Sequence, residues 1–139
     1  MAEKRCPACF SEFSGAVCSC GYHENANHQL PMGTLLRKRY QIGRVLGQGG
    51  YGITYLCWDT LMQRPVAVKE FFPEGTVYRR SDISTNVECV TDRVVPHFEY
   101  TRERFLREAS ALVKFQDVPE VVCIHDFVEE NNTAYIVME

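Results

Sequence analysis

The stretch Leu46-Gly47-Gln48-Gly49-Gly50-Tyr51-Gly52-Ile53-Thr54 decides the fold, because it sets four glycines between two segments of strand-like sequence. Residues 40–46 precede the glycines, and residues 53–58, rich in β-branched and aromatic side chains, follow them. Glycine has no Cβ, so backbone N–H groups in such a turn can approach phosphate oxygens closely. The spacing G-x-G-x-x-G is a weak signal alone, and a glycine-rich hairpin without a ligand is the alternative.

Two other phosphate-binding arrangements do not fit the residues around these glycines. A dinucleotide-binding fingerprint requires a helix after the last glycine, whereas residues 53–58 predict a strand. A Walker-type loop requires Lys followed by Ser or Thr at the place where Ile53 stands. The glycines therefore predict a turn between two strands.

Residues 66–72 predict a third strand, which Pro65 opens at the position where a missing N–H costs least. Within Val66-Ala67-Val68-Lys69, the side chains of Ala67 and Lys69 share one face of the strand. The small side chain of Ala67 leaves room for a flat base, and the ammonium of Lys69 can reach phosphates. A lysine on a strand is usually only solvated, but this lysine lies close to the glycine-rich turn.

Residues 101–115 change to helical spacing, with Phe105, Ala109 and Leu112 on one face and Thr101 as the expected N-cap. Glu108 lies at the edge of that apolar face, from which a carboxylate can reach a lysine on the sheet; an exposed helical glutamate is the alternative. Residues 121–128 and 134–138 predict two further strands, joined by a turn over 129–132 in which Asn tolerates the left-handed conformation.

Together these residues resemble the protein-kinase family over about residues 35–139. Gly47-x-Gly49-x-x-Gly52 resembles its glycine-rich loop, and Val66-Ala67-Val68-Lys69 resembles its V-A-I-K strand. Phe105-Leu106-Arg107-Glu108-Ala109 resembles the αC helix, whose glutamate pairs with the strand lysine. Residues 135–139 resemble the fifth strand, with Met138 as gatekeeper and Glu139 opening the hinge. The segments 52–55 and 69–73 resemble a bacterial group of these kinases.

The resemblance implies an α+β fold, namely the N-terminal lobe of a eukaryotic-like serine/threonine kinase with a five-stranded antiparallel sheet and one αC-type helix. It also implies the residues that bind ATP, which carries Mg²⁺ in the full-length protein. These are Leu46, Gly47, Gln48, Gly49, Gly50, Tyr51, Gly52, Ile53, Thr54, Ala67, Lys69, Glu108, Met138 and Glu139.

Two features depart from the family pattern. Thr54 stands where the family usually has Val, although it is still β-branched. Lys69 and Glu108 are 108 − 69 = 39 positions apart, about twice the usual separation, which predicts an insertion over 73–100 with a short extra hairpin.

The catalytic motifs H-R-D-x-x-x-x-N and D-F-G are absent from these 139 residues. We therefore expect an inactive fragment that lacks the C-lobe, within a parent enzyme that phosphorylates proteins on Ser or Thr. A pseudokinase or a zinc-dependent interaction module is the alternative. Leu112 and Ile124 resemble positions of a hydrophobic spine that continues into the C-lobe, so we expect them to face water and to favour self-association. We expect weak ATP binding because the C-lobe would supply half of the adenine pocket.

Composition narrows the environment and the partners. The net charge of −3 shows no basic field, so nucleic acid is not an expected partner. No apolar run approaches the ~20 residues of a membrane span, and the first residues lack a secretory signal, so we expect a cytoplasmic protein.

In a reducing compartment, clustered cysteines indicate a metal site. Residues 1–22 carry Cys6-Pro7-Ala8-Cys9 and Cys18-Ser19-Cys20-Gly21, which resemble a minimal zinc ribbon with one residue missing from the second pair; residues 23–34 predict a linker. Structural Zn²⁺ at these four thiolates is the main hypothesis, and His23 is a substitute ligand if the second pair cannot close the site. The alternatives are a disordered reduced tail and redox switching through Cys18 and Cys20. We expect the remaining cysteines to be small side chains of the apolar core, because apolar residues flank them: Cys57, Cys89 and Cys123.

Overall fold

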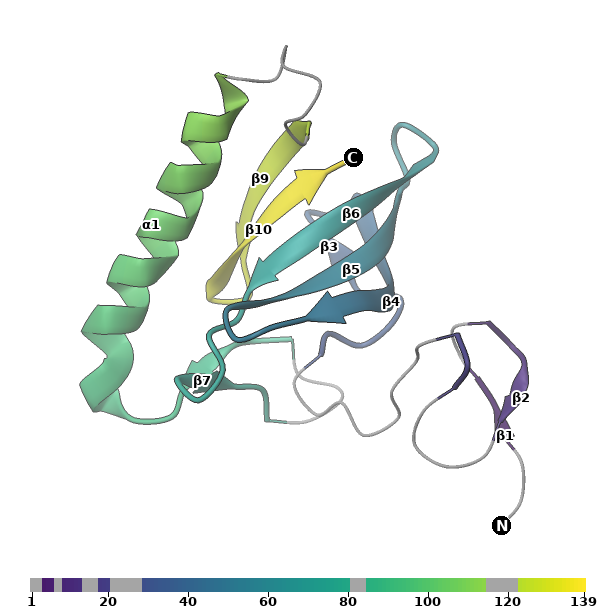
Figure 1. Ribbon diagram of the computed structural model, residues 1–139, viewed down its shortest axis with the longest axis horizontal. Helices are drawn as coiled ribbons and strands as arrows, with labels where there is room; N and C mark the ends of the chain where they lie inside the picture. The colour runs from purple at the N-terminus through teal and green to yellow at the C-terminus, as the bar shows by residue number, and fades with distance from the viewer. Residues whose placement is uncertain (1–3, 7–8, 14–17, 21–28, 81–84, 115–122) are drawn as a thin grey trace.

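A six-stranded antiparallel sheet forms the centre of the computed structural model, which describes residues 4–6, 9–13, 18–20, 29–80, 85–114 and 123–139 (Figure 1). Its strands run in the order β3-β4-β5-β6-β10-β9. In chain order they are β3 (Leu35–Leu36), β4 (Tyr40–Gln48), β5 (Gly52–Asp59), β6 (Arg64–Phe71), β9 (Ile124–Glu130) and β10 (Thr133–Met138).

The prediction of five strands is wrong by one, because β3 adds a two-residue strand beside β4. The turn between them places Arg37 and Lys38 at φ 51° and 54°. Tight hairpin turns of this conformation normally use Gly, Asn or Asp, so the sequence offered no turn signal here. The predicted Asn turn does form between β9 and β10, with Asn131 and Asn132 at φ 56° and 60°. The predicted strand 121–128 begins outside the described residues, which resume at Cys123.

The one long helix among the described residues, α1 (Val95–Val113), begins earlier than predicted and follows the short 3₁₀ helix η1 (Asp92–Val94). Thr101 is therefore not the N-cap: it lies inside α1, and its hydroxyl donates to the carbonyl oxygens of His97 and Phe98. A proline occupies the first turn, where its missing N–H has no helical partner to lose. None of the described helices is long and apolar enough to cross a membrane.

In the described part of the chain, two small hairpins accompany the main sheet. The segment that the sequence assigns to an insertion contains β7 (Val77–Tyr78) paired with β8 (Glu88–Cys89), while residues 95–100 of that segment belong to α1. In the cysteine module, β1 (Lys4–Arg5) pairs with β2 (Glu12–Phe13).

The sheet separates two layers of side chains. Along β5, Ile53, Tyr55 and Cys57 are buried in the main core, and the residues between them are more exposed. On the other face, α1 packs against β9 and β10, and the Phe71 ring stacks on Phe98 with centroids 5.8 Å apart. Alternation along the strands therefore gives one face to the core and leaves the other to α1 and to open surface.

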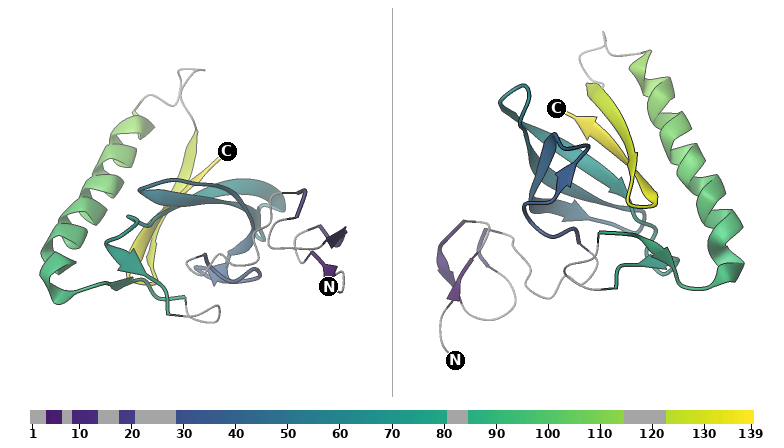
Figure 2. Two further views of the ribbon diagram at one scale, coloured as in Figure 1. Left: turned by 60° about the horizontal axis from the view of Figure 1, so that its bottom comes forward. Right: turned by 180° about the vertical axis from the view of Figure 1, so that it is seen from behind.

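The sheet curls (Figure 2, left), and side chains of the β3–β4 turn and of β4 reach β9. Arg37, from the β3–β4 turn, donates to the Asp126 carboxylate at 2.9 Å and to the Phe127 carbonyl at 2.6 Å on β9. The hydroxyl of Tyr40 donates to the same Asp126 carboxylate at 2.9 Å. These contacts join the edges of the sheet, which leaves β9 less exposed to pairing with another chain.

Asp59 ends β5 and is buried beside Arg39. Its carboxylate accepts two hydrogen bonds from the Arg39 guanidinium, at 2.8 and 2.9 Å, and further bonds from the backbone N–H groups of Leu61 and Met62. The hydrogen bonds from Arg39 lower the pKa of Asp59 to about 2. Burial acts in the opposite direction, and the two backbone N–H groups lower the pKa further.

We expect Asp59→Asn to be less stable than the parent chain at neutral pH and to approach it in acid. The folded pKa of about 2 lies below the unfolded value of 3.8, so the carboxylate stabilises the fold fully above pH 3.8 and loses that effect as pH falls toward 2. Urea unfolding at pH 7 and pH 3 measures the difference. Asp92→Asn, at an exposed acid, is the control, and an equal deficit of Asp59→Asn at both pH values would contradict the prediction.

Candidate functional site

Strand register gathers several predicted site residues on one face of the sheet. Lys69 lies between Thr54 of β5 and Ile136 of β10, and Ala67 lies between Leu56 and Met138. Thr54, Ala67 and Met138 are half-buried, and Lys69 is exposed. Ala67 has the smallest side chain that β6 presents on this face. The next β6 residue on the same face is Lys69, which carries the ammonium group. The result is a partly apolar surface with a positive charge beside it.

The glycine-rich turn lies against the segment that follows β6. The N–H of Gly49 donates to the carbonyl of Gly52 at 2.9 Å across the turn. The carbonyl of Gly50 accepts from the N–H of Glu74 at 2.8 Å, and the carbonyl of Tyr51 accepts from the N–H of Phe72 at 3.0 Å. Two backbone bonds therefore fix the tip of the turn, while the Tyr51 side chain remains 79% exposed.

An open pocket of about 480 Å³ lies between this turn, β6 and α1. Lys69 and Glu108 both line it, so the structure brings together the lysine and the glutamate that the sequence singled out. Tyr51 lines it from the glycine-rich turn, and Arg104 lines it from α1. The full lining is Tyr51, Lys69, Phe71, His97, Thr101, Arg104, Phe105 and Glu108.

The carboxylate of Glu108 is bonded to Arg104 rather than to Lys69. The Nε of Arg104, one helical turn earlier, donates to it at 2.9 Å, and both side chains are well exposed. Within the described part of the chain no ion pair joins Lys69 to Glu108. Sequence reasoning missed Arg104, although the i,i+4 spacing of Arg and Glu on a helix was the available signal.

Other predicted residues differ in their exposure. Glu139 follows β10, and its N–H donates to the Cys123 carbonyl at 3.1 Å. Leu112 is 46% exposed, as expected, but Ile124 is only 8% exposed. The expectation that Ile124 faces water is wrong, because Ile124 packs in a cluster with Ala109 of α1 and with β10.

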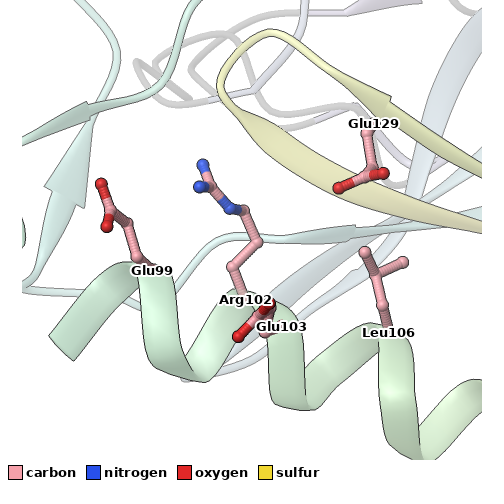
Figure 3. Close-up of a pocket in the computed structure, with 5 residues that line it drawn as sticks. All are labelled: Glu99, Arg102, Glu103, Leu106 and Glu129. Atoms are coloured by element: carbon pink, nitrogen blue, oxygen red, sulfur yellow. The ribbon is translucent and has the colours of Figure 1, made fainter. Parts of the chain in front are cut away.

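A second pocket of about 280 Å³ lies between α1 and β9 (Figure 3). Glu99, Arg102, Glu103 and Leu106 reach it from α1, and Glu129 reaches it from β9. Arg102 already donates to the carbonyl and side-chain oxygens of Asn132. None of the predicted site residues lines this pocket.

The four N-terminal cysteines converge, with their sulfur atoms all within 4.8 Å of one another. Cys6 and Cys20 bring their Sγ atoms to 3.6 Å, as do Cys9 and Cys18. Four thiolates around one Zn²⁺ at about 2.3 Å stand about 3.8 Å apart, which is close to these distances. Hydrogen bonds from Ser11 lower the pKa of Cys9 to about 6, which favours the thiolate that a metal requires. His23 lies outside the described residues.

Comparison with known proteins identifies relatives of the chain. No protein-family model matches it. The chain is 34% identical to the serine/threonine-protein kinase PrkC of Bacillus subtilis over 108 aligned residues. The alignment covers 78% of this chain and 13% of PrkC. It is 31% identical over 112 residues to serine/threonine-protein kinase C of Synechocystis sp., covering 76% of this chain and 17% of the relative. The solved structure of the PpkA-294 apo form matches with a TM-score of 0.74 and 29% identity, over 81% of this chain and 38% of that one.

These relatives confirm the resemblance that the motifs predicted: the chain is homologous to part of the bacterial serine/threonine protein kinases. It spans only 13% and 17% of the length of the two curated relatives described. The structural match extends over most of the chain and agrees with an α+β lobe carrying one long helix.

We expect Gly52→Ala to lower the free energy of unfolding by about 1–3 kcal/mol, because an added Cβ would lie 2.7 Å from the backbone oxygen of Glu70. Gly49→Ala is the matched control within the same turn, since nothing lies within 4 Å of a Cβ there. Urea unfolding measures both variants. Equal stabilities for the two would show that β5 and β6 do not approach each other as closely as the structure has them.

Proposed function

We propose that this chain supplies the ATP-binding lobe of a protein kinase whose full-length form phosphorylates proteins on Ser or Thr. The observation that carries the proposal is the pocket in which Lys69, the glycine-rich turn and Glu108 of α1 come together. In kinases these three elements hold the phosphates and the lysine–glutamate ion pair. The kinship with serine/threonine kinases supports the same assignment.

Each part of the site takes one part of the nucleotide in this proposal. The half-buried Thr54, Ala67 and Met138 offer an apolar face to adenine, with Leu46 and Glu139 at its border. The Lys69 ammonium binds phosphate oxygens, and the backbone of 47–52 covers them. Glu108 exchanges Arg104 for Lys69, a step that costs little because exposed ion pairs contribute only about 0.3–0.5 kcal/mol.

Phosphoryl transfer requires a catalytic base and magnesium ligands, which the family supplies from motifs absent in these 139 residues. We propose that the 139 residues bind nucleotide without transferring phosphate. Self-association through the surface that bears the exposed Leu112 stays a prediction.

We expect Lys69→Met to weaken ATP binding about tenfold or more, because it removes a charge-assisted contact to phosphate. Calorimetric titration of the chain with ATP, up to millimolar concentration, measures the affinity. Lys38→Met, at an exposed lysine in the β3–β4 turn, is the control and should bind as the parent chain does. Unchanged affinity in Lys69→Met, or no binding by the parent chain, would refute the assignment. In the full-length kinase the same variant should abolish phosphoryl transfer with the fold intact.

The cysteine cluster favours a second function, a structural zinc site in the N-terminal module. Cys6, Cys9, Cys18 and Cys20 offer four thiol ligands at spacings close to a tetrahedral site. Among the described residues of this module Cys6 and Cys18 are buried, and the half-buried Cys20 packs against them. A module this small buries too little apolar surface to fold alone, so a metal would supply its stability.

We expect about one zinc per chain after purification without chelator, and a loss of zinc in Cys9→Ser and Cys20→Ser, since each removes a thiolate ligand. Elemental analysis measures the stoichiometry. Cys89→Ser, at a half-buried cysteine outside the cluster, is the control and should retain the metal. Zinc far below one equivalent in the parent chain would leave a reduced tail or a redox pair as the better description.

A further inference from the structure

A buried ion pair lies directly behind the lysine of the proposed nucleotide site. Glu70 follows Lys69 in β6 and points to the opposite face of the strand, where its side chain is 0% exposed. The guanidinium of Arg79, also 0% exposed, donates to both carboxylate oxygens of Glu70, one of them at 3.2 Å. The pair fixes β6 to the segment that follows it.

The surrounding groups complete the hydrogen bonding of this pair. The hydroxyl of Tyr55 donates to the Glu70 carboxylate at 2.8 Å and accepts from the N–H of Leu30 at 3.0 Å. The Nε of Arg79 donates to the Thr85 carbonyl at 2.9 Å. Burial raises the pKa of Tyr55, so its hydroxyl keeps the proton that it donates. A buried ion pair persists only with this kind of geometry.

We call residues 72–80 and 85–90 the insert. At one end, its N–H groups at Phe72 and Glu74 hold the tip of the glycine-rich turn, as described above. At the other end, the N–H of Val87 donates to the Asn131 carbonyl at 2.9 Å, and the side chain of Asn132 donates to the Val87 carbonyl at 3.0 Å. The insert therefore contacts the glycine-rich turn, the lysine strand and the β9–β10 turn.

We propose that the insert positions the nucleotide site and that Arg79 is its positioning residue; the inference rests on the proposed function. Arg79 holds the insert against Glu70, and the insert in turn holds the carbonyls of Gly50 and Tyr51. A glycine-rich turn has much conformational freedom to lose when a ligand binds. A turn that is ordered in advance loses less, and its ligand binds more tightly.

The test needs a variant that removes the pair and still folds. Arg79→Met alone leaves a buried carboxylate without its cation, which is strongly destabilising. The double variant Glu70→Gln/Arg79→Met removes both charges, and the new amide oxygen can still accept from Tyr55. Arg79→Lys is the second variant: it keeps the charge but loses the two-point contact. Arg80→Met is the matched control, because Arg80 is the exposed neighbour that pairs with Glu88.

Two measurements read the positioning. Hydrogen exchange at the Phe72 and Glu74 amides reports the hold on the glycine-rich turn, and calorimetry with ATP reports the affinity. In the double variant we expect about tenfold faster exchange at these two amides, unchanged exchange at core amides such as Val68, and ATP binding about tenfold weaker. Arg79→Lys should fall between the double variant and the parent chain, and Arg80→Met should match the parent chain.

Each contrary result has its own meaning. Unchanged exchange at Phe72 and Glu74, or a rise only in step with the core, would overturn the positioning role whether or not ATP binds. Parent-like ATP affinity in the double variant, with binding lost in Lys69→Met, would overturn it and leave the proposed function standing. Absence of ATP binding in the parent chain would refute the proposed function, while the exchange data would still decide whether Arg79 holds the turn. If the double variant does not fold, the same comparisons apply to Arg79→Lys.

Discussion

The contact between Glu70 and Arg79, both removed from water, is the constraint on which the rest of the lobe depends. A charge in the interior is costly unless its partner stays in place, so the insert cannot leave the sheet without exposing or orphaning one of the two. Consecutive residues of a strand face opposite sides, so the adjacent residues Lys69 and Glu70 of β6 point to the open surface and to the core, respectively. The β6 residue of the buried ion pair, Glu70, is therefore the immediate neighbour of the site lysine, Lys69, and any shift of β6 would move both.

The β9–β10 turn extends this constraint to α1. Asn131 and Asn132 adopt left-handed conformations and bond to Val87 of the insert, while Arg102 of α1 donates to the carbonyl of Asn132. The aromatic contacts of Phe71 with α1 add a less directional attachment on the same side. The β9–β10 turn and the insert therefore connect α1 to the glycine-rich turn through successive hydrogen bonds. No hydrogen bond joins α1 to the glycine-rich turn directly among the described residues.

Local patterns were sufficient to predict much of this lobe. Strand-like composition located β4, β5, β6 and β10, the glycine spacing located the turn, and the kinase resemblance predicted that Lys69 and Glu108 lie near each other. The start of α1 differed from the prediction because Val94 offers no side-chain cap that would mark it, so that only Pro96 in the first turn signals the helix start. The Glu70–Arg79 pair was missed for a different reason: a charge that will be buried looks the same in sequence as one that will be solvated, and only the tertiary packing distinguishes them.

The Arg104–Glu108 pair bears on how the proposed site completes itself. Glu108 and Lys69 line the same pocket. Glu108 is paired instead with Arg104, through an exposed ion pair within one turn of α1, and such pairs contribute little stability. A polyphosphate bound to Lys69 would draw the lysine ammonium into the pocket, where the local dielectric constant is lower than in water. An ion pair with a carboxylate is stronger there. Under the proposed function, ligand binding and formation of the lysine–glutamate pair therefore reinforce each other by a rearrangement of side chains, on a backbone that the buried pair behind β6 has already fixed.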